Sequence, residues 1–217
     1  MKNVLEIDGV FLEFGNRQIL NDVYFKNETG KVSGILGRNG SGKSCLMRLI
    51  IGTLDCRNQS VRINGQSVLK NKELDKNFKY LHQQHFIPGF LTLKRLFNNF
   101  SVSFDDFIKV FPEFSGNWNS KINQLAGGEK RIVEIYLTLC SKSKFCLLDE
   151  PFSQLMPLNI EKIKELIQRE KLGKGITLTD HRYEDLLDVS DSVYVIKSGK
   201  TQLIKSVEDL KYLGYIN

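Results

Sequence analysis

The sequence lacks any apolar run long enough to cross a bilayer. No stretch of its 217 residues approaches the ~18 consecutive apolar residues that a membrane-spanning helix needs. A secretion signal is also missing, because Glu6 and Asp8 fall inside what would have to be its apolar core. We therefore expect a cytoplasmic protein that is either soluble or peripheral on a membrane.

Cysteine pairs and extreme charge are absent too. The four cysteines show no C-x-x-C spacing and lie in apolar runs, which favours reduced core thiols over metal or redox use; they are Cys45, Cys56, Cys140 and Cys146. Lys and Arg number 31 against 25 Asp and Glu, a net charge of +6 that suits polyanions in general and selects none. With 41% hydrophobic residues the composition is that of an ordinary globular protein. The length predicts a single domain, or one with a small insert.

Apolar strands alternate with helices along most of the chain. The strands expected from apolar runs are 4–8, 19–25, 32–36, 145–148, 176–179 and 193–196, and the expected helices are 43–51, 129–140, 158–171 and 206–215. The Asn64-Gly65 pair predicts a hairpin turn. This order indicates an α/β fold whose sheet is largely parallel in its centre.

The residue pattern changes between residues 86 and 125. Phenylalanines recur in steps of three and four, at positions 97, 100, 104, 107, 111 and 114. Ser103 with Asp106 predicts a helix cap, and Pro112 a helix end. We interpret the segment as a small helical insert. Its rings either pack the insert onto the sheet or, at Phe90 and Phe97 above all, form a docking patch for a partner.

The segment Gly37-Arg38-Asn39-Gly40-Ser41-Gly42-Lys43-Ser44 fits the phosphate-loop pattern G-x-x-x-x-G-K-[ST]. It follows an expected buried strand and opens an expected helix, as the mechanism requires. Glycines let successive backbone N–H groups point inward, and the helix N-terminus adds its positive dipole. Lys43 brings a full charge to the β- and γ-phosphates, while the Ser44 hydroxyl can ligate Mg²⁺.

A second motif supplies the carboxylates that such a loop needs. The apolar strand Phe145-Cys146-Leu147-Leu148 ends in Asp149-Glu150-Pro151. Asp149 would hold Mg²⁺ through its water shell, and Glu150 could polarise an attacking water.

Together with Leu125-Ala126-Gly127-Gly128-Glu129, these motifs resemble the ATP-binding cassette (ABC) ATPases over essentially the whole chain. The resemblance implies a P-loop NTPase fold with a mixed, centrally parallel sheet, an antiparallel β subdomain and a helical subdomain at 85–125, all within one domain, 1–217. It also implies ATP and Mg²⁺ as cofactors. The implied nucleotide contacts come from Phe14, Gly37, Arg38, Asn39, Gly40, Ser41, Gly42, Lys43, Ser44, Cys45 and the signature Leu125, Ala126, Gly127, Gly128 and Glu129.

Three further residues are placed by their order within the family pattern. Gln83, favoured over Gln84, matches a glutamine that precedes the helical insert and ligates the metal together with Ser44 and Asp149. His181, at the end of a later strand, matches a histidine that contacts the γ-phosphate. Phe14, with Phe11 as the alternative, matches the aromatic residue that stacks on adenine. The implied catalytic set is Glu150, His181, Gln83 and Lys43.

The resemblance further implies a head-to-tail dimer in which each site combines the phosphate loop of one chain with the signature of the other. The partner is a second copy or another ABC ATPase chain. Because the chain has no spanning segment, driving transport requires a separate transmembrane permease, which would hold it at the cytoplasmic face of the membrane. The alternatives are a soluble ABC ATPase that remodels a non-membrane target and a weakly hydrolysing nucleotide-dependent regulator. We expect no nucleic-acid partner, since the family members that act on nucleic acid have paired cassettes or a long coiled-coil insert.

Two positions depart from the family pattern. Ala126 replaces the signature serine, and Met156 stands where an aspartate normally reaches across the dimer. Both losses fall on groups given to the opposite site. A lost hydrogen bond to a charged group costs ~1.5–3 kcal/mol, so we expect turnover to be weakened but retained in a homodimer, or a mixed pair with a complete partner.

Overall fold

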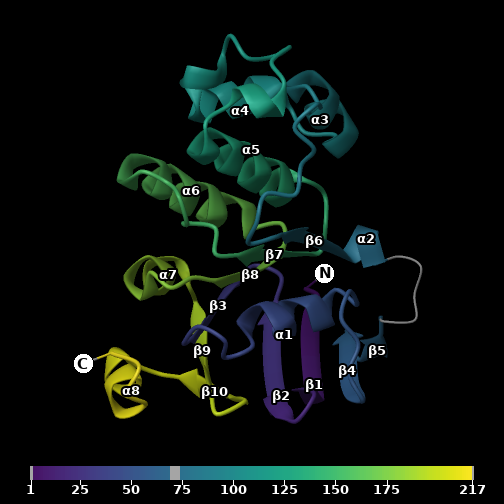
Figure 1. The fold of residues 1–217 in the computed structure, drawn as a ribbon, viewed down its shortest axis with the longest axis vertical. Helices are drawn as coiled ribbons and strands as arrows, with labels where there is room; N and C mark the ends of the chain where they lie inside the picture. The colour runs from purple at the N-terminus through teal and green to yellow at the C-terminus, as the bar shows by residue number, and fades with distance from the viewer. Residues whose placement is uncertain (1, 69–73, 217) are drawn as a thin grey trace.

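The computed structural model describes residues 2–68 and 74–216, and its largest element is a six-stranded sheet (Figure 1). The strand order is β10-β9-β3-β8-β7-β6, and all neighbours are parallel except the β10–β9 pair. The strands are β3 (Val32–Gly37), β6 (Phe78–Leu81), β7 (Phe145–Asp149), β8 (Gly175–Thr179), β9 (Ser192–Lys197) and β10 (Lys200–Ile204). The expected α/β fold with a mixed, centrally parallel sheet is confirmed.

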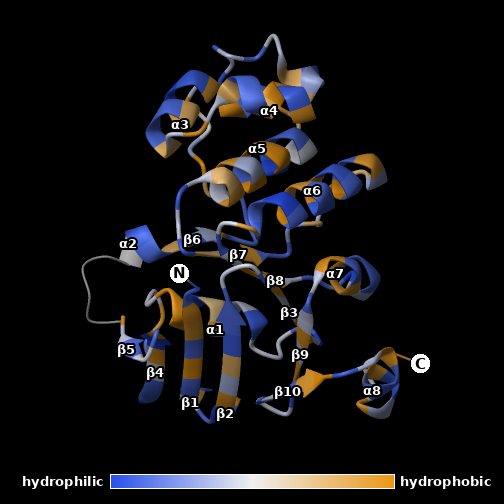
Figure 2. Ribbon diagram, turned by 180° about the vertical axis from the view of Figure 1, so that it is seen from behind, coloured by the Kyte–Doolittle hydropathy of each residue, from blue (hydrophilic) through white to orange (hydrophobic). Residues whose placement is uncertain are grey.

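A four-stranded antiparallel sheet, in the order β2-β1-β4-β5, lies beside it. Its strands are β1 (Val4–Phe14), β2 (Arg17–Glu28), β4 (Asn58–Ile63) and β5 (Gln66–Ser67). Polar and apolar residues alternate along β1 and β2 (Figure 2), because one face of this sheet is buried. The turn between β4 and β5 places both Asn64 and Gly65 at positive φ, the backbone of a tight hairpin.

Helix α1 (Lys43–Ile50) packs its apolar residues into one core with the antiparallel sheet. The opposite side of the six-stranded sheet is covered by α5 (Gly127–Cys140), α6 (Pro157–Glu170) and α7 (Tyr183–Val189) (Figure 1). The remaining core helices are the short α2 (Leu74–Asn77) and α8 (Val207–Tyr212). Within the described part of the chain, no helix is long and apolar enough to span a membrane.

The segment between β6 and α5 is helical and lies on α5 (Figure 1). It contains α3 (Leu93–Phe100), α4 (Phe104–Val110) and the 3₁₀ turns η1 (Pro112–Phe114) and η2 (Ile122–Gln124). The Ser103 hydroxyl accepts a hydrogen bond from Asp106 N at 3.1 Å, which is the predicted cap. Helix α4 ends at Val110, two residues before Pro112.

The phenylalanine stripe mainly packs this segment together. Phe97, Phe107 and Phe111 are buried against Tyr136 of α5, with ring centroids 4.8 Å apart for the Phe107–Tyr136 pair, and the buried Phe114 packs on Phe107 and Phe111. Including Phe97 in a docking patch was therefore wrong, because its 1% exposure leaves no surface for a partner.

Phe90 remains available for a partner, with 69% of its surface exposed.

The parallel strands bring several chain segments to one edge of the sheet. In the register, Ile35 of β3 and Asp149 of β7 both pair with Thr179 of β8. The segments that leave the carboxyl ends of these strands are the phosphate loop, Glu150 and His181. They therefore converge at that edge, where open α/β sheets bind ligands.

Candidate functional site

The phosphate loop connects β3 to α1. Gly40 and Gly42 have φ values of 76° and 102°, a backbone region that other residues adopt only with strain. A side chain at Gly42 would also meet Leu20 at 2.7 Å. Gly42 is the N-cap of α1 and provides no side-chain cap, so the first N–H groups of the helix stay available to an anionic ligand.

Lys43 lies under this loop. Only 6% of the residue is exposed, and Nζ donates a hydrogen bond to the Gly37 carbonyl at 2.8 Å. Burial lowers the pKa of Lys43, whereas the nearby Glu150, Asp149 and Asp180 raise it. The Lys43 ammonium is thus a poorly solvated cation that can donate hydrogen bonds to phosphate oxygens in place of the Gly37 carbonyl.

Asp149 is buried at the end of β7, and both of its carboxylate oxygens accept hydrogen bonds. Thr179 Oγ1 donates to Oδ1 at 2.6 Å, and the Tyr80 hydroxyl donates to Oδ2 at 3.0 Å. Burial and the Asp149 charge raise the pKa of Tyr80, which keeps this hydroxyl a donor. Each oxygen retains a lone pair for a water or a metal.

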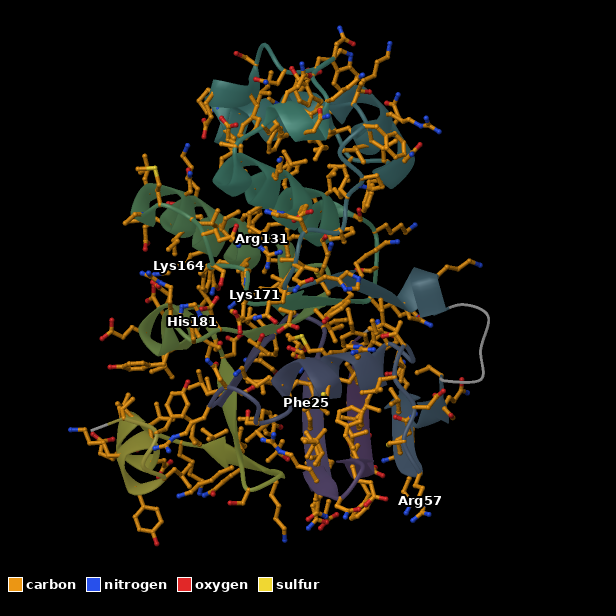
Figure 3. All side chains as sticks on the ribbon, in the orientation of Figure 1. Phe25, Arg57, Arg131, Lys164, Lys171 and His181 are labelled. Atoms are coloured by element: carbon orange, nitrogen blue, oxygen red, sulfur yellow. The ribbon has the colours of Figure 1, made fainter. Side chains whose placement is uncertain are left out.

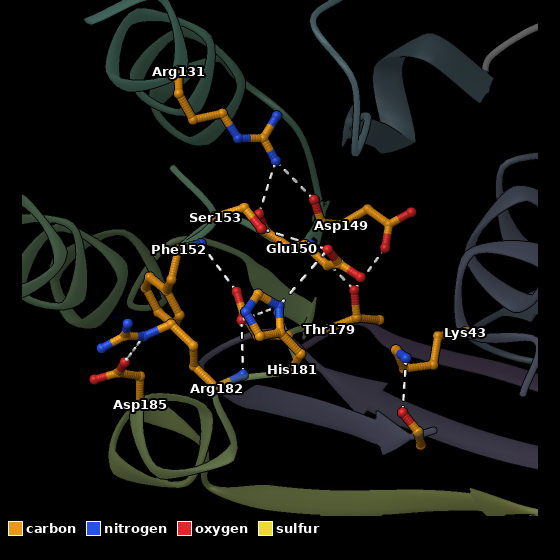
Figure 4. A network of polar contacts seen from close by, with 12 residues as sticks. Lys43, Arg131, Asp149, Glu150, Phe152, Ser153, Thr179, His181, Arg182 and Asp185 are labelled. Atoms are coloured by element: carbon orange, nitrogen blue, oxygen red, sulfur yellow. Dashed lines mark hydrogen bonds and ion pairs between the residues drawn. The ribbon is translucent and has the colours of Figure 1, made fainter. Parts of the chain in front are cut away.

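Glu150, the next residue, has a left-handed backbone with φ 50°. Its N–H donates to the Thr179 carbonyl at 3.0 Å, and its Oε2 accepts from Ser153 Oγ at 3.4 Å. For a non-glycine residue this conformation is strained, and such strain persists only where the surroundings hold it, typically at functional sites. The conformation directs the Glu150 carboxylate toward the cavity and His181 (Figure 4).

His181 follows the buried Asp180. Asp180 accepts backbone hydrogen bonds from Phe152 and Arg182, both at 3.0 Å. Burial raises the pKa of Asp180, and these two bonds partly offset the shift. His181 Nδ1 lies 3.5 Å from Asp180 Oδ1 and 3.9 Å from Glu150 Oε2, and 59% of its side chain is exposed. The ring is therefore anchored beside the carboxylates while its far edge remains free.

These segments enclose a cavity of about 590 Å³. The residues that line it are Phe14, Arg17, Ile19, Asn39, Gly40, Ser41, Gly42, Lys43, Ser44, Cys45, Gln83, Glu150 and His181. The expected phosphate loop, aromatic residue, glutamine, glutamate and histidine thus come together. Gln83 lines the cavity and Gln84 does not, and Phe14 lies at the cavity with 52% exposure.

Some expected contact residues lie elsewhere. Gly37 and Asp149 do not line the cavity: the Gly37 carbonyl accepts a hydrogen bond from Lys43 Nζ, and Asp149 Oδ1 accepts one from Thr179 Oγ1. Arg38 points away, toward the Gly214 carbonyl at 3.1 Å.

The signature residues Leu125, Ala126, Gly127, Gly128 and Glu129 begin α5 and do not line this cavity. Ala126 is the N-cap of α5 and offers no side-chain cap, while Glu129 accepts from Ala126 N at 2.7 Å.

Sequence reasoning missed Tyr80, Thr179 and Arg131, which touch Asp149 or Glu150. It also missed Arg17 and Ile19 at the cavity. The Thr-x-Thr-Asp-His sequence at the end of β8 offered a signal for Thr179. A hydroxyl at the last residue of a strand, just before an acidic residue, lies close to the end of the neighbouring parallel strand. The others depend on tertiary pairing that local pattern does not encode.

Among the described residues, no three His, Cys, Asp or Glu side chains form a metal-binding group of their own. Candidate ligands are instead the Ser44 hydroxyl, the Gln83 amide oxygen and the Asp149 carboxylate. These are hard oxygen donors, the type that Mg²⁺ prefers when substrate phosphates and waters complete its shell.

The profile of the family described as ABC transporter matches residues 20–153, more than half of the chain. The chain belongs to the ABC transporter family. A galactose/methyl galactoside import ATP-binding protein of Clostridium perfringens is 29% identical over 96% of this chain, which spans 44% of that protein's length. The lipopolysaccharide export system ATP-binding protein LptB of Haemophilus influenzae is 27% identical over 91% of this chain and 88% of its own length.

Solved structures of the ABC transporter family agree with the fold. A structure described as the ATP binding subunit of an ABC transporter superimposes with a TM-score of 0.83 at 24% sequence identity, covering 97% of this chain and 93% of that one. A bacterial Atm1-family exporter with ATP bound gives a TM-score of 0.85 at 20% identity, covering 98% of this chain and 40% of the exporter chain. At these identities the likeness demonstrates the P-loop fold.

Proposed function

We propose that this chain binds ATP with Mg²⁺ in the cavity, hydrolyses it as part of a dimer, and thereby powers a separate membrane permease. The family and the ATP-binding subunits among its relatives support the nucleotide. The observation that carries the proposal is the convergence of Lys43, Ser44, Gln83, Glu150 and His181 on one cavity from four separate chain segments.

The residues divide the chemistry between them. The phosphate-loop N–H groups and Lys43 bind the β- and γ-phosphates, and Phe14 stacks on the adenine. Ser44, Gln83 and, through water, Asp149 hold Mg²⁺, which supplies charge neutralisation at the phosphate oxygens. Glu150 polarises the attacking water, and His181 donates a hydrogen bond to the γ-phosphate.

The dimer is proposed because the signature lies outside the cavity of its own chain. A second ABC chain would cover the nucleotide with its own signature, so ATP would favour the closed pair and hydrolysis would release it. Ala126 and Met156 weaken what this chain offers its partner. We therefore propose either a slow homodimer or a mixed pair in which the partner has a complete signature.

We propose that a membrane permease is the partner that ATP hydrolysis by this chain drives. The names of the relatives include import and export systems, which supports transport and leaves its direction open. The helical subdomain, residues 85–125, provides the docking surface, which includes the exposed Phe90. Binding to the permease would place the chain on the cytoplasmic face of the membrane.

The test measures both the rate of ATP hydrolysis and the association of two chains. We expect the purified chain to hydrolyse ATP with Mg²⁺ and to stop when EDTA removes the metal, with a rate per chain that rises with chain concentration. Glu150→Gln should remain folded, lose turnover and elute as an ATP-dependent dimer on sizing chromatography. Glu165→Gln, an exposed carboxylate on α6, is the matched control and should behave as the unmodified chain.

Different outcomes refute different parts. Calorimetry that detects no heat of ATP binding to folded chain refutes the whole proposal. A rate per chain that is independent of concentration refutes the dimer, and a fast homodimer refutes the roles given to Ala126 and Met156. Binding without turnover, with Glu150→Gln indistinguishable from the unmodified chain, favours the nucleotide-dependent regulator.

A further inference from the structure

Among the residues that the structure describes, Arg131 on α5 has the largest fully buried side chain. Figure 3 places it between α5 and the strands of the six-stranded sheet. Its guanidinium donates to three backbone carbonyls: His82 at 2.7 Å, Asp149 at 2.8 Å and Glu150 at 2.9 Å. One side chain thus joins the segment that carries Gln83 to the segment that carries Glu150. Figure 4 shows its two bonds to the Asp149 and Glu150 carbonyls.

Glu134, one turn further along α5, is 1% exposed and completes the connection. Its carboxylate accepts from His85 Nδ1 at 2.9 Å, from Phe86 N at 3.1 Å and from Ile87 N at 3.4 Å. Arg131 Nη1 lies 3.8 Å from Glu134 Oε2, so the two charges compensate each other inside the protein.

Burying this pair is costly, and fold stability alone explains it poorly. Removing two charges from water costs several kcal/mol per ion, and a well-packed apolar pair is often at least as stable. Arg131 also leaves Nε without an acceptor among the described residues. What the pair achieves is geometric, because the planar guanidinium holds several carbonyls in one fixed arrangement, whereas a lysine ammonium is a compact charge with rotatable donors.

The Glu150 carbonyl is the most informative of these contacts. Glu150 adopts the strained left-handed backbone, which requires surrounding groups that over-determine it. The backbone is held from one side by Thr179 and from the other by Arg131. A change in either contact would let the carboxylate leave its position at the cavity.

We propose that Arg131 and Glu134 are positioning residues that hold Glu150 and the segment 82–87, with Gln83, in a fixed arrangement on α5. Neither residue lines the cavity, so they act through the residues they hold. The inference rests on the proposed function, because it assigns Glu150 and Gln83 their roles at ATP.

The test replaces Arg131 by lysine, which keeps the charge and loses the planar guanidinium. We expect kcat for ATP to fall at least tenfold, about 1.4 kcal/mol, while the Kd of a non-hydrolysable ATP analogue changes less than about twofold. Arg169→Lys is the matched control, a half-exposed arginine on α6 that should retain full activity. Glu134→Gln provides a second, nearly isosteric variant if Arg131→Lys does not fold.

Hydrogen exchange supplies a readout that does not depend on turnover. In Arg131→Lys, the amides of Glu150 and Phe152 should exchange faster, as should those of Phe86 and Ile87 in Glu134→Gln. The amide of Leu46 in α1 should exchange at its original rate.

Unchanged exchange at these four amides, uniformly faster exchange throughout the chain, or a loss of nucleotide affinity equal to the loss of kcat overturns the inference. A wild-type chain that never hydrolyses ATP refutes the proposed function, and the exchange experiment still decides whether the two residues hold these segments.

Discussion

The substitution Thr179→Val removes the hydroxyl that orients Asp149. The variant keeps the approximate shape of the side chain, loses the 2.6 Å bond from Thr179 Oγ1 to Asp149 Oδ1, and loses the 3.2 Å bond that Oγ1 accepts from Glu150 N. A hydrogen bond to a charged group contributes ~1.5–3 kcal/mol, and the Asp149 oxygen left behind is buried. We therefore expect the free energy of unfolding to fall by ~2 kcal/mol or more.

Thr177→Val is the matched control, because Thr177 lies two residues away on the same strand and is equally buried. Its hydroxyl accepts only a neutral bond from Asn27 Nδ2 at 2.9 Å, and that amide also donates to the Ile176 carbonyl. The expected loss is ~0.5–1.5 kcal/mol.

Urea unfolding measures both variants, and turnover at saturating ATP and Mg²⁺ separates stability from function. Thr179→Val should lose turnover as well, because the proposed metal ligand is no longer held, whereas Thr177→Val should keep it. Equal destabilisation by the two variants, with full turnover in Thr179→Val, would refute the reasoning.

Three further substitutions test other parts of the structure. Lys43→Met should lower ATP affinity at least tenfold by calorimetry while leaving thermal stability unchanged or raised, because burial disfavours the charged form of Lys43. Lower stability with unchanged affinity would contradict this. Gly214→Ala should lower the Tm by about 2–4 °C, since φ 64° costs a side chain about 1 kcal/mol, whereas Gly116→Ala, at a negative-φ site with open space, should not. Phe114→Ala should destabilise the chain by about 3–5 kcal/mol in urea, because the ring is buried against Phe107 and Phe111. A loss below about 1 kcal/mol would show that the insert is loosely packed.

Much of the central fold was predictable because most of its strands and helices carry a local signal. Apolar runs predicted four of the five parallel strands to within a residue or two, and the phosphate-loop glycines marked the start of α1. The short elements β6 and α7 were not predicted. The antiparallel strands were less predictable. Expected at 4–8 and 19–25, they extend over Val4–Phe14 and Arg17–Glu28.

The antiparallel strands were hard to predict because the alternation of polar and apolar residues is interrupted within them. Gly9 has φ 62°, and the β1–β2 register shifts between Ile7 and Val10 and again beyond. Such bulges let a strand continue where the two-residue period fails.

The residues of the candidate site also differ in how well the sequence predicts them. The phosphate loop, Asp149 and Glu150 belong to contiguous motifs whose chemistry is visible in the sequence. Tyr80, Thr179 and Arg131 gain their roles only when β6, β8 and α5 pack around β7. The cysteines show the same limit: only Cys146 is buried, and the other three are half-buried because their runs lie at the edges of elements.

The Arg38–Gly214 contact has a practical consequence for producing this protein. Helix α8 ends in a turn whose Leu213 and Gly214 carbonyls accept from Lys197 and Arg38, and Arg38 belongs to the phosphate loop. A truncation before Gly214, or a fusion that unfolds this turn, would remove the carbonyl that holds the Arg38 guanidinium. Any version of the protein prepared for the binding measurements described above should therefore keep the turn after α8 intact.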